Sequence, residues 1–146
     1  MKKEYTVIIN APIDKAFAAV DDESNIKKWM GGDITTTYLN LKDRENPVGT
    51  KFQQKIAGIS ALGGEGEIIA YDKPRLLGVG TNSALAKATF FYNFEQLNEN
   101  STKLTCALEI ATPNTFKEKT IAMLMPIINK LMNKQLNTLK KLAEGQ

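Results

Sequence analysis

Four glutamates on the predicted strands are the side chains best suited to acid–base chemistry. Glu65 and Glu67 alternate along one predicted strand, and Glu95 and Glu109 lie on two others. A carboxylate acts as a general acid or base when burial or a neighbouring charge shifts its pKa toward neutrality. Strand periodicity instead places all four on a solvated outer face. A catalytic role would require a carboxylate that is buried beside Tyr92.

The 146-residue sequence contains no histidine and one cysteine, Cys106. The lack of histidine excludes His-assisted serine or cysteine triads, His general bases and the usual mixed-ligand zinc sites. Cys106 is expected to point inward as a small apolar residue without a nearby base, which makes it a poor nucleophile. The Gly-rich segment 63–66 is not a phosphate-binding loop, because no helix follows it. We therefore predict no catalytic residue, no metal site and no cofactor.

A second group of residues is suited to binding an apolar small molecule. Their side chains fall on faces that we expect to be buried, and Tyr38, Gln54 and Tyr92 add polar groups that can orient a ligand. The alternative is that these side chains simply fill the core. The predicted ligand-binding residues are Trp29, Met30, Tyr38, Phe52, Gln54, Phe90, Tyr92, Leu124, Ile128 and Leu131.

Side chains on the C-terminal segment also favour a cavity. Met123, Met125 and Met132 carry flexible thioethers, which suit irregular apolar surfaces. Gln135 and Thr138 lie within or beside the apolar face, where a buried polar group needs a partner that a ligand or water can supply.

The connection between residues 57 and 64 is unusually apolar for a hairpin loop. Together with the segment 84–86, it predicts a gate over a cavity entrance, formed by Ile59, Leu62 and Leu85. The alternative is that Ile59 and Leu62 fold back onto the core.

These residues must be positioned by a long amphipathic helix, which we predict from Thr115 to about Ala143. Thr115 and Glu118 have the spacing of a capping box, and Pro113 blocks earlier helix growth. Pro126 removes one backbone hydrogen bond, which predicts a bend around a sheet or, alternatively, a hinge beside the cavity mouth. The apolar face of this helix contains Ile121, Leu124, Met125, Ile128, Leu131, Met132, Leu139 and Leu142.

Most of the preceding chain has the alternating pattern of strands, with turn residues between them. Short connections favour antiparallel neighbours. The predicted strands span residues 4–10, 34–41, 50–57, 64–71, 75–82, 86–97 and 102–111.

The register of the last two strands follows from their apolar residues. A turn centred on Glu99 makes both strands direct their apolar side chains to one face, whereas a slip of one residue would oppose them to polar ones. The opposed pairs are then Phe94 with Leu104, Tyr92 with Cys106, Phe90 with Leu108, and Ala88 with Ile110.

Two short helices are predicted after the first strand. The first begins at residues 11–14, where Pro12 suits the first helical turn and Asp14 suits the positive end of the helix dipole. The second runs from Ser24 to Met30. The pattern predicts the α+β class, with a curved antiparallel sheet of about seven strands around the long C-terminal helix.

Composition limits the partners that we expect. The net charge of +3 is modest, and the lysines are concentrated on the solvent-exposed side of the last helix. We therefore do not expect nucleic acid as a partner. The apolar segments fall short of the ~20 residues that span a bilayer, which predicts no stable membrane insertion. A single cysteine and the lack of a visible secretory signal predict a cytoplasmic protein.

The opening sequence VIINAPIDKAFAAVDDESNIKKWMGG is similar to the start of proteins in the START-related (SRPBCC) superfamily. The matching features are Ala11-Pro12, Phe17, Trp29, the segment 48–50 and the long closing helix. This superfamily includes polyketide cyclase/dehydrase-like proteins, lipid-transfer domains and birch-pollen-allergen-like proteins. The resemblance implies a helix-grip fold, with a hydrophobic cavity between the sheet and the helix.

Taken as a whole, the chain is expected to be a single START-like ligand-binding domain spanning residues 1–146. Our leading hypothesis is the binding, transport or sequestration of a hydrophobic or amphipathic small molecule. The alternatives implied by the resemblance are a polyketide cyclase/dehydratase-like enzyme and a chaperone-activator-like module that binds an unknown protein partner.

Overall fold

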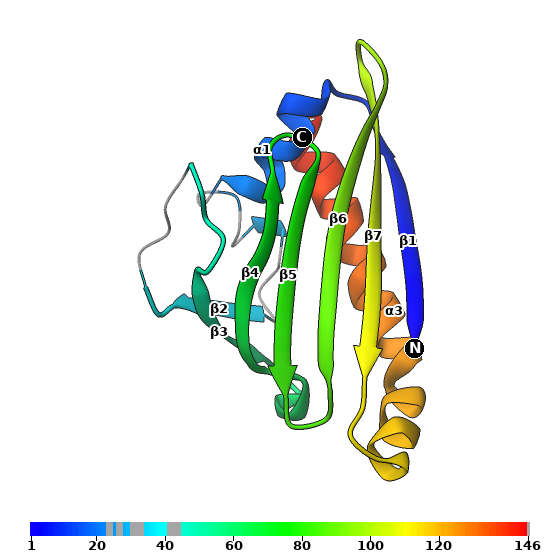
Figure 1. Ribbon diagram of the computed structural model, residues 1–146. Helices are drawn as coiled ribbons and strands as arrows, with labels where there is room; N and C mark the ends of the chain where they lie inside the picture. Colours follow the sequence, from blue (N-terminus) through cyan, green and yellow to red (C-terminus); the bar gives the residue numbers. More distant parts are fainter. Residues whose placement is uncertain (23–24, 26–27, 30–33, 41–44, 146) are drawn as a thin grey trace.

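The computed structural model describes residues 1–22, 25, 28–29, 34–40 and 45–145. These residues contain one antiparallel sheet of seven strands, an α-helix after the first strand, another after the last strand, and a short 3₁₀ helix (Figure 1). The elements are β1 (Lys2–Ile9), α1 (Ile13–Asp21), β2 (Ile34–Tyr38), β3 (Lys51–Ile56), η1 (Ser60–Leu62), β4 (Gly64–Asp72), β5 (Leu76–Ser83), β6 (Lys87–Asn98), β7 (Ser101–Ala111) and α3 (Thr115–Ala143). The predicted α+β class is confirmed. The predicted second helix, from Ser24 to Met30, lies mostly outside the described residues.

The strand order is β1-β7-β6-β5-β4-β3-β2. Strands that are consecutive in the sequence pair with one another from β2 to β7, as expected for short connections. The exception is β1, which pairs with β7 and places Tyr5 opposite Cys106. This pairing places the first strand of the chain beside the last one, at one edge of the sheet.

The predicted register between β6 and β7 is confirmed. Phe94 pairs with Leu104, Tyr92 with Cys106, Phe90 with Leu108, and Ala88 with Ile110. Leu104 and Cys106 are fully buried, whereas Glu95 and Glu109 are exposed on the opposite face. The alternation of apolar and polar residues therefore determines which face of this hairpin is covered.

Helix α3 spans the predicted residues, but its predicted N-terminal cap is wrong. The cap is Asn114, whose side chain accepts a hydrogen bond of 2.9 Å from the backbone N–H of Lys117. Asn114 has extended backbone angles, so its side chain reaches the third residue of the helix. Thr115 is already the first helical residue, which puts it one position too late for the predicted capping box with Glu118.

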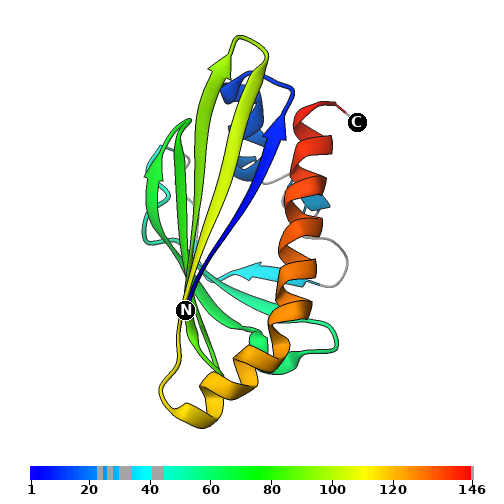
Figure 2. The same cartoon turned by 90° about the vertical axis from the view of Figure 1, so that its right-hand side faces the viewer.

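The helix continues through Pro126 and its axis bends in the N-terminal part (Figure 2). Beyond the bend it packs against α1 and β1. Two side chains of α3 hydrogen-bond to β1: the Asn129 side chain accepts from the Tyr5 hydroxyl, and the Lys140 ammonium donates to the Ile8 carbonyl at 2.9 Å. The C-terminal part of the helix is therefore held to one edge of the sheet. No helix within the described residues has the length and apolarity needed to cross a membrane.

The end of α3 is also linked to the chain after β1 through Glu144, and this link predicts a pH effect. Its carboxylate accepts hydrogen bonds from the Lys140 ammonium at 2.6 Å and from the Asn10 backbone N–H at 2.7 Å. These bonds hold the pKa of Glu144 below its ordinary value of 4.5. A lowered folded-state pKa stabilises the protein fully above the unfolded-state pKa and loses that contribution as the pH falls through the folded-state pKa. We expect Glu144→Gln to reduce the loss of stability between pH 7 and about pH 3, measured by urea unfolding.

Glu109→Gln is the matched control, because Glu109 is exposed on the outer face of β7. It should leave the pH dependence closer to that of the natural chain than Glu144→Gln does. Identical pH profiles for Glu144→Gln and the natural chain would contradict the proposed link.

Candidate functional site

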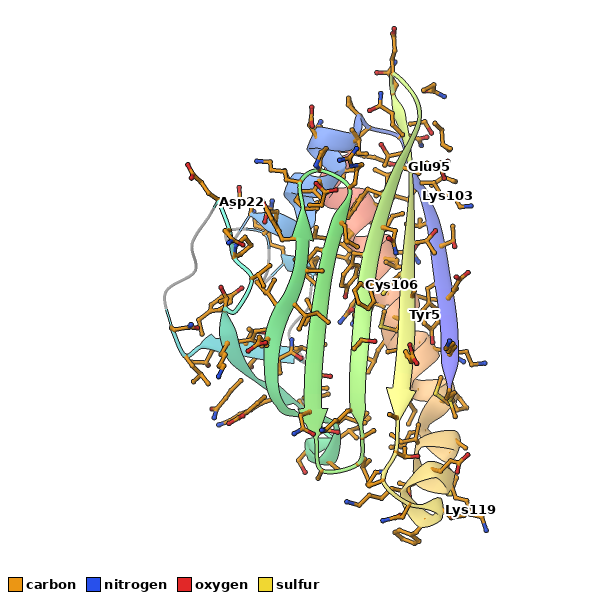
Figure 3. The ribbon with its side chains drawn as sticks, in the orientation of Figure 1. Tyr5, Asp22, Glu95, Lys103, Cys106 and Lys119 are labelled. Atoms are coloured by element: carbon orange, nitrogen blue, oxygen red, sulfur yellow. The ribbon has the colours of Figure 1, made fainter. Side chains whose placement is uncertain are left out.

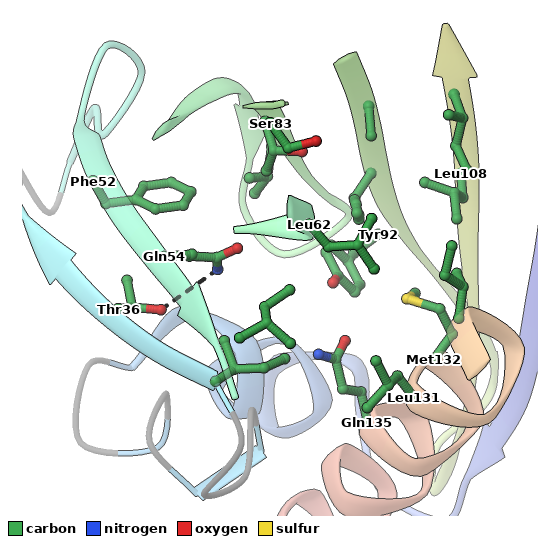
Figure 4. A pocket seen from close by; sticks show the side chains of 18 of the residues that line it. Thr36, Phe52, Gln54, Leu62, Ser83, Tyr92, Leu108, Leu131, Met132 and Gln135 are labelled. Carbon is green, nitrogen blue, oxygen red and sulfur yellow. Dashed lines mark hydrogen bonds between the residues drawn. The ribbon is translucent and has the colours of Figure 1, made fainter. Parts of the chain in front are cut away.

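A cavity of about 170 Å³ lies between the sheet and α3 (Figure 4). Side chains from β2 to β7, from η1 and from α3 line it, together with Trp29 and Ala86. On the helix, the lining residues are Ile121, Ile128, Leu131, Met132 and Gln135. The apolar faces of the helix and the sheet therefore leave a space between them that the protein's own side chains do not occupy.

The shape of the sheet explains where this space arises. Strand β2 runs at a steep angle to β5, β6 and β7 (Figure 1). The register shifts between Ile68 and Ala70 in β4, and such a bulge increases the local twist of a strand. The helix is held at the β1 edge, while β2 and β3 turn across the opposite side. The cavity lies in the space between these elements.

Most of the predicted site residues line the cavity. They are Trp29, Tyr38, Phe52, Gln54, Phe90, Tyr92, Ile128 and Leu131, and Leu62 from the predicted gate. Leu124 and Leu85 are half-buried against the core instead, and Ile59 is half-buried without being part of the described lining. Met30 lies outside the described residues.

Sequence reasoning did not assign β5 to the site. Leu77, Val79, Thr81 and Ser83 all line the cavity from alternating positions of this strand. The register pairs Leu77 with Tyr92, Val79 with Phe90, and Thr81 with Ala88. The period-two rule, if carried from β6 to its neighbour, would have identified these residues.

The C-terminal helix contributes fewer polar and thioether groups than predicted. Gln135 lines the cavity and points its amide into it (Figure 4), whereas the Thr138 hydroxyl donates to the Lys134 carbonyl at 2.9 Å. Met132 lines the cavity, Met125 is buried, and Met123 is 80% exposed. The prediction that Met123 belongs to an adaptable apolar surface in the cavity is therefore wrong, because its side chain projects from the opposite side of the helix.

Aromatic side chains fix two walls of the cavity. The rings of Tyr38 and Phe52 meet edge to face at 6.2 Å, and those of Trp29 and Tyr92 do so at 5.9 Å. The Gln54 amide donates a hydrogen bond to the Thr36 hydroxyl at 3.4 Å. Trp29 is 4% exposed, and its indole Nε1–H is a buried donor with no hydrogen-bond partner in the described structure.

Tyr92 lines the cavity and pairs across the strands with the buried Cys106. Burial raises the pKa of Tyr92 well above its ordinary value, and the neighbouring Cys106 side chain raises it further. Burial also raises the pKa of the Cys106 thiol to about 12. Both groups are therefore protonated at neutral pH, so Cys106 is not an activated nucleophile and Tyr92 is not a base.

The four glutamates considered for acid–base chemistry do not reach the cavity. Glu65, Glu95 and Glu109 are exposed, and Glu67 is half-buried on β4. Glu95 pairs across the strands with Lys103, near the β6–β7 hairpin (Figure 3). None of the described lining residues is charged. The described residues also contain no group of three Cys, Asp or Glu side chains that could hold a metal ion.

Gly66 makes room for one of the aromatic walls. It pairs with Phe52, and a Cβ at Gly66 would lie 2.4 Å from the Phe52 ring. We expect Gly66→Ala to displace this ring and to destabilise the fold by about 1–3 kcal/mol, with weaker binding of any molecule in the cavity. Urea unfolding and probe titration measure the two effects.

Gly80→Ala on the neighbouring strand is the control. A Cβ there would meet Ile69 at 3.5 Å, which is an ordinary contact. If Gly66→Ala were no more disruptive than Gly80→Ala, the argument from the Phe52 contact would be wrong.

Several solved structures share this arrangement of sheet and helix. Norcoclaurine synthase from Thalictrum flavum superposes with a TM-score of 0.77 at 11% identity, covering 100% of this chain and 94% of that chain. The Zhui aromatase/cyclase from Streptomyces sp. R1128 superposes with a TM-score of 0.78 at 12% identity, covering 99% and 93%. This chain has the helix-grip fold. The resemblance to START-related proteins is thereby confirmed at the level of the fold.

A third structure with the helix-grip fold contains small molecules. It is norcoclaurine synthase from Thalictrum flavum in complex with dopamine and hydroxybenzaldehyde, with a TM-score of 0.74 and 13% identity, covering 100% of this chain and 88% of that chain. In sequence, no family model and no curated protein matches this chain. Identities this low establish the shared helix-grip fold alone.

Proposed function

We propose that this protein is a single-domain binding protein that holds a hydrophobic or amphipathic small molecule between the sheet and α3. The cavity of about 170 Å³ is the observation that carries this proposal. A cavity needs a volume of only about 10–15 Å³ to hold one water molecule. The space is therefore more than ten times larger than a single-water void.

The composition of the lining supports an apolar guest. Ile, Leu, Val and aromatic side chains make up most of the walls, with a few polar groups among them. Burial of apolar ligand surface would contribute roughly 25 cal/mol per Å². The polar groups would orient the ligand rather than supply most of its affinity. Norcoclaurine synthase in complex with dopamine and hydroxybenzaldehyde is an example of a protein with this fold that binds small molecules.

Part of the cavity boundary is a candidate gate. Leu62 lies in η1 and belongs to the lining, and this segment joins β3 to β4. We propose that Leu62, with Ile59 and Leu85 in the adjoining segments, controls ligand entry. Loops between rigid strands are the parts of a fold that adjust most readily.

The chemistry of the described lining favours binding over catalysis. Tyr92 and Cys106 remain protonated at neutral pH, and neither forms part of an acid–base pair with a carboxylate. The two named enzymes with this fold do not change this inference, because the likeness concerns the fold. We therefore propose a binding protein as the function.

Trp29 provides a direct test, because it is the only tryptophan and lines the cavity. The purified protein is titrated with neutral fluorescent and non-fluorescent apolar probes, including fatty alcohols, sterols and bicyclic aromatics. We expect saturable one-to-one binding that changes the Trp29 emission, and native mass spectrometry should detect the bound mass. If none of the probe classes bound saturably, the proposal would be wrong.

A further inference from the structure

The outward side of the N-terminal half of α3 is unusually apolar. Phe116 is 77% exposed, Met123 80% and Ile127 44%, and the first two are the most exposed large hydrophobic side chains in the described structure. With about 100° of rotation per residue, the three lie within about 40° of one another around the helix axis. Ala122 and Pro126, beside them, are exposed as well. We call Phe116, Met123 and Ile127 the apolar row. Exposed apolar side chains that gather on one face mark an interaction site.

Lysines accompany the apolar row along the same side of the helix. Lys119 and Lys130 are exposed, and each lies within about 40° of Met123 around the helix axis. Helix α3 contains six lysines and one acidic residue, Glu118, which lies about 140° from Met123. The side of the helix that carries the apolar row is therefore positively charged, and no acidic residue of α3 lies on it.

Exposed apolar side chains flanked by lysines fit the surface of an anionic lipid bilayer. The apolar groups can enter the boundary between headgroups and acyl chains while the ammonium groups stay at the anionic headgroups. The apolar row projects outward from a helix, and a fluid bilayer accommodates protruding side chains without a preformed groove. A protein partner would need a surface of matching shape. A second copy of this chain would place lysines opposite lysines, which is unfavourable.

The apolar row lies close to the part of the fold that borders the cavity. Ile121 and Ile128 line the cavity from the opposite face of the same helical segment. The N-terminal part of α3, η1 and the β5–β6 turn all lie at one end of the molecule (Figure 1, Figure 2). The candidate gate belongs to this end, because Leu62 lies in η1 and Leu85 lies in the β5–β6 turn. Contact through the apolar row would therefore bring the candidate gate to a bilayer, where apolar small molecules concentrate.

We infer that the apolar row and the lysines beside it form a docking surface for an anionic lipid bilayer. Phe116 and Met123 insert among the lipid headgroups, and Lys119 and Lys130 lie at their anionic groups. The helix lies along the bilayer surface and does not cross it. This surface is separate from the cavity, so the inference goes beyond the proposed function and rests on different side chains.

Sedimentation with sucrose-loaded vesicles tests the inference. One vesicle type contains phosphatidylcholine alone, and the other contains phosphatidylcholine mixed with phosphatidylserine. We expect the natural chain to bind the mixed vesicles about tenfold more tightly, because lysines near an anionic surface are attracted to it. Added salt should reduce this difference, because it screens the attraction.

Two pairs of variants locate the contact, and all four positions are solvent-accessible, so the variants should fold. Phe116→Ser should weaken binding to the mixed vesicles about tenfold, because less apolar surface enters the bilayer. Its control is Leu97→Ser, because Leu97 is 49% exposed beside the β6–β7 turn, at the other end of the molecule (Figure 1). Lys119→Gln should weaken binding about fivefold. Its control is Lys15→Gln, because Lys15 is exposed on α1. Both controls should bind as the natural chain does.

Several results would overturn the inference. Equal binding of the natural chain to both vesicle types, no binding to either, or unchanged binding by Phe116→Ser would each do so. Self-association that is lost in Phe116→Ser, without vesicle binding, would identify a second copy of the chain as the partner instead. The proposed function is tested separately by probe titration, because these variants leave the described cavity lining unchanged.

Discussion

Replacing Ala88 by phenylalanine should weaken probe binding by roughly 100-fold, which corresponds to about 2.8 kcal/mol, while the protein stays folded. Ala88 lies on the inner face of β6, where it pairs with Thr81 on one side and Ile110 on the other. All three residues line the cavity. A phenyl ring at this position would extend into the space of about 170 Å³ that the ligand is proposed to occupy.

The physical basis of this expectation is competition for one volume. The new ring can bury its surface in the existing space, so the cost of overpacking should be small compared with substitution in a filled core. The ligand loses contacts over the same surface. The affinity should therefore fall without a matching loss in the free energy of unfolding, which titration calorimetry and urea unfolding measure separately.

Thr89→Phe is the matched control, because it adds the same ring one residue along β6. Thr89 pairs with Glu109 and Gly80 on the outer face of the sheet. This variant should bind the probes about as well as the natural chain does. Unchanged binding in a folded Ala88→Phe protein would show that the probes bind elsewhere.

Phe17→Ala should produce the largest loss of stability, about 3–5 kcal/mol in the free energy of unfolding. Phe17 is fully buried on α1, and its ring meets those of Tyr71 and Phe94 edge to face at 5.7 and 5.3 Å. Truncation removes these contacts and leaves a void between the helix and the sheet. The Tyr71 hydroxyl also donates a hydrogen bond to Asp21 at 2.9 Å, so its ring cannot move freely into that void.

Urea unfolding measures this loss directly. Lys15→Ala is the control on the same helix, because Lys15 is exposed. It should change the free energy of unfolding by no more than about 0.5 kcal/mol. A loss below about 1 kcal/mol for Phe17→Ala would contradict the packing argument, because such a small value is typical of a site that is not tightly packed.

Phe17→Ala and Ala88→Phe test two different regions of the fold. Phe17 belongs to the solid packing between α1 and the sheet, whereas Ala88 borders the space that remains unfilled. The C-terminal part of α3 packs against α1 and β1, away from β2 and β3. Rigid packing at one edge is what allows the rest of the helix to cover a cavity without collapsing into it.

Local patterns in the sequence were enough to predict the strands of the sheet, the helices α1 and α3, and one register. Apolar residues repeat with helical spacing across the segment that forms α3, and alternation in β6 and β7 allows only one register that covers both apolar faces. The same alternation identified Phe52, Phe90 and Tyr92 as inward-facing residues. These properties depend on neighbours within a few residues, or on two strands joined by a tight turn. The sequence therefore contains the information directly.

The cavity and its polarity depend on the tertiary structure. The pairing of β1 with β7, the steep crossing of β2 and the position of α3 at one edge together decide whether the apolar faces meet or leave space. The sequence alone also predicted the wrong helix cap, because Asn114 and Thr115 are both good capping residues and only backbone angles select between them. The tertiary structure likewise decides that the buried Trp29 N–H has no hydrogen-bond partner among the described residues. Whether a buried donor has a partner depends on groups that distant segments bring to it, and no periodicity in the sequence records them.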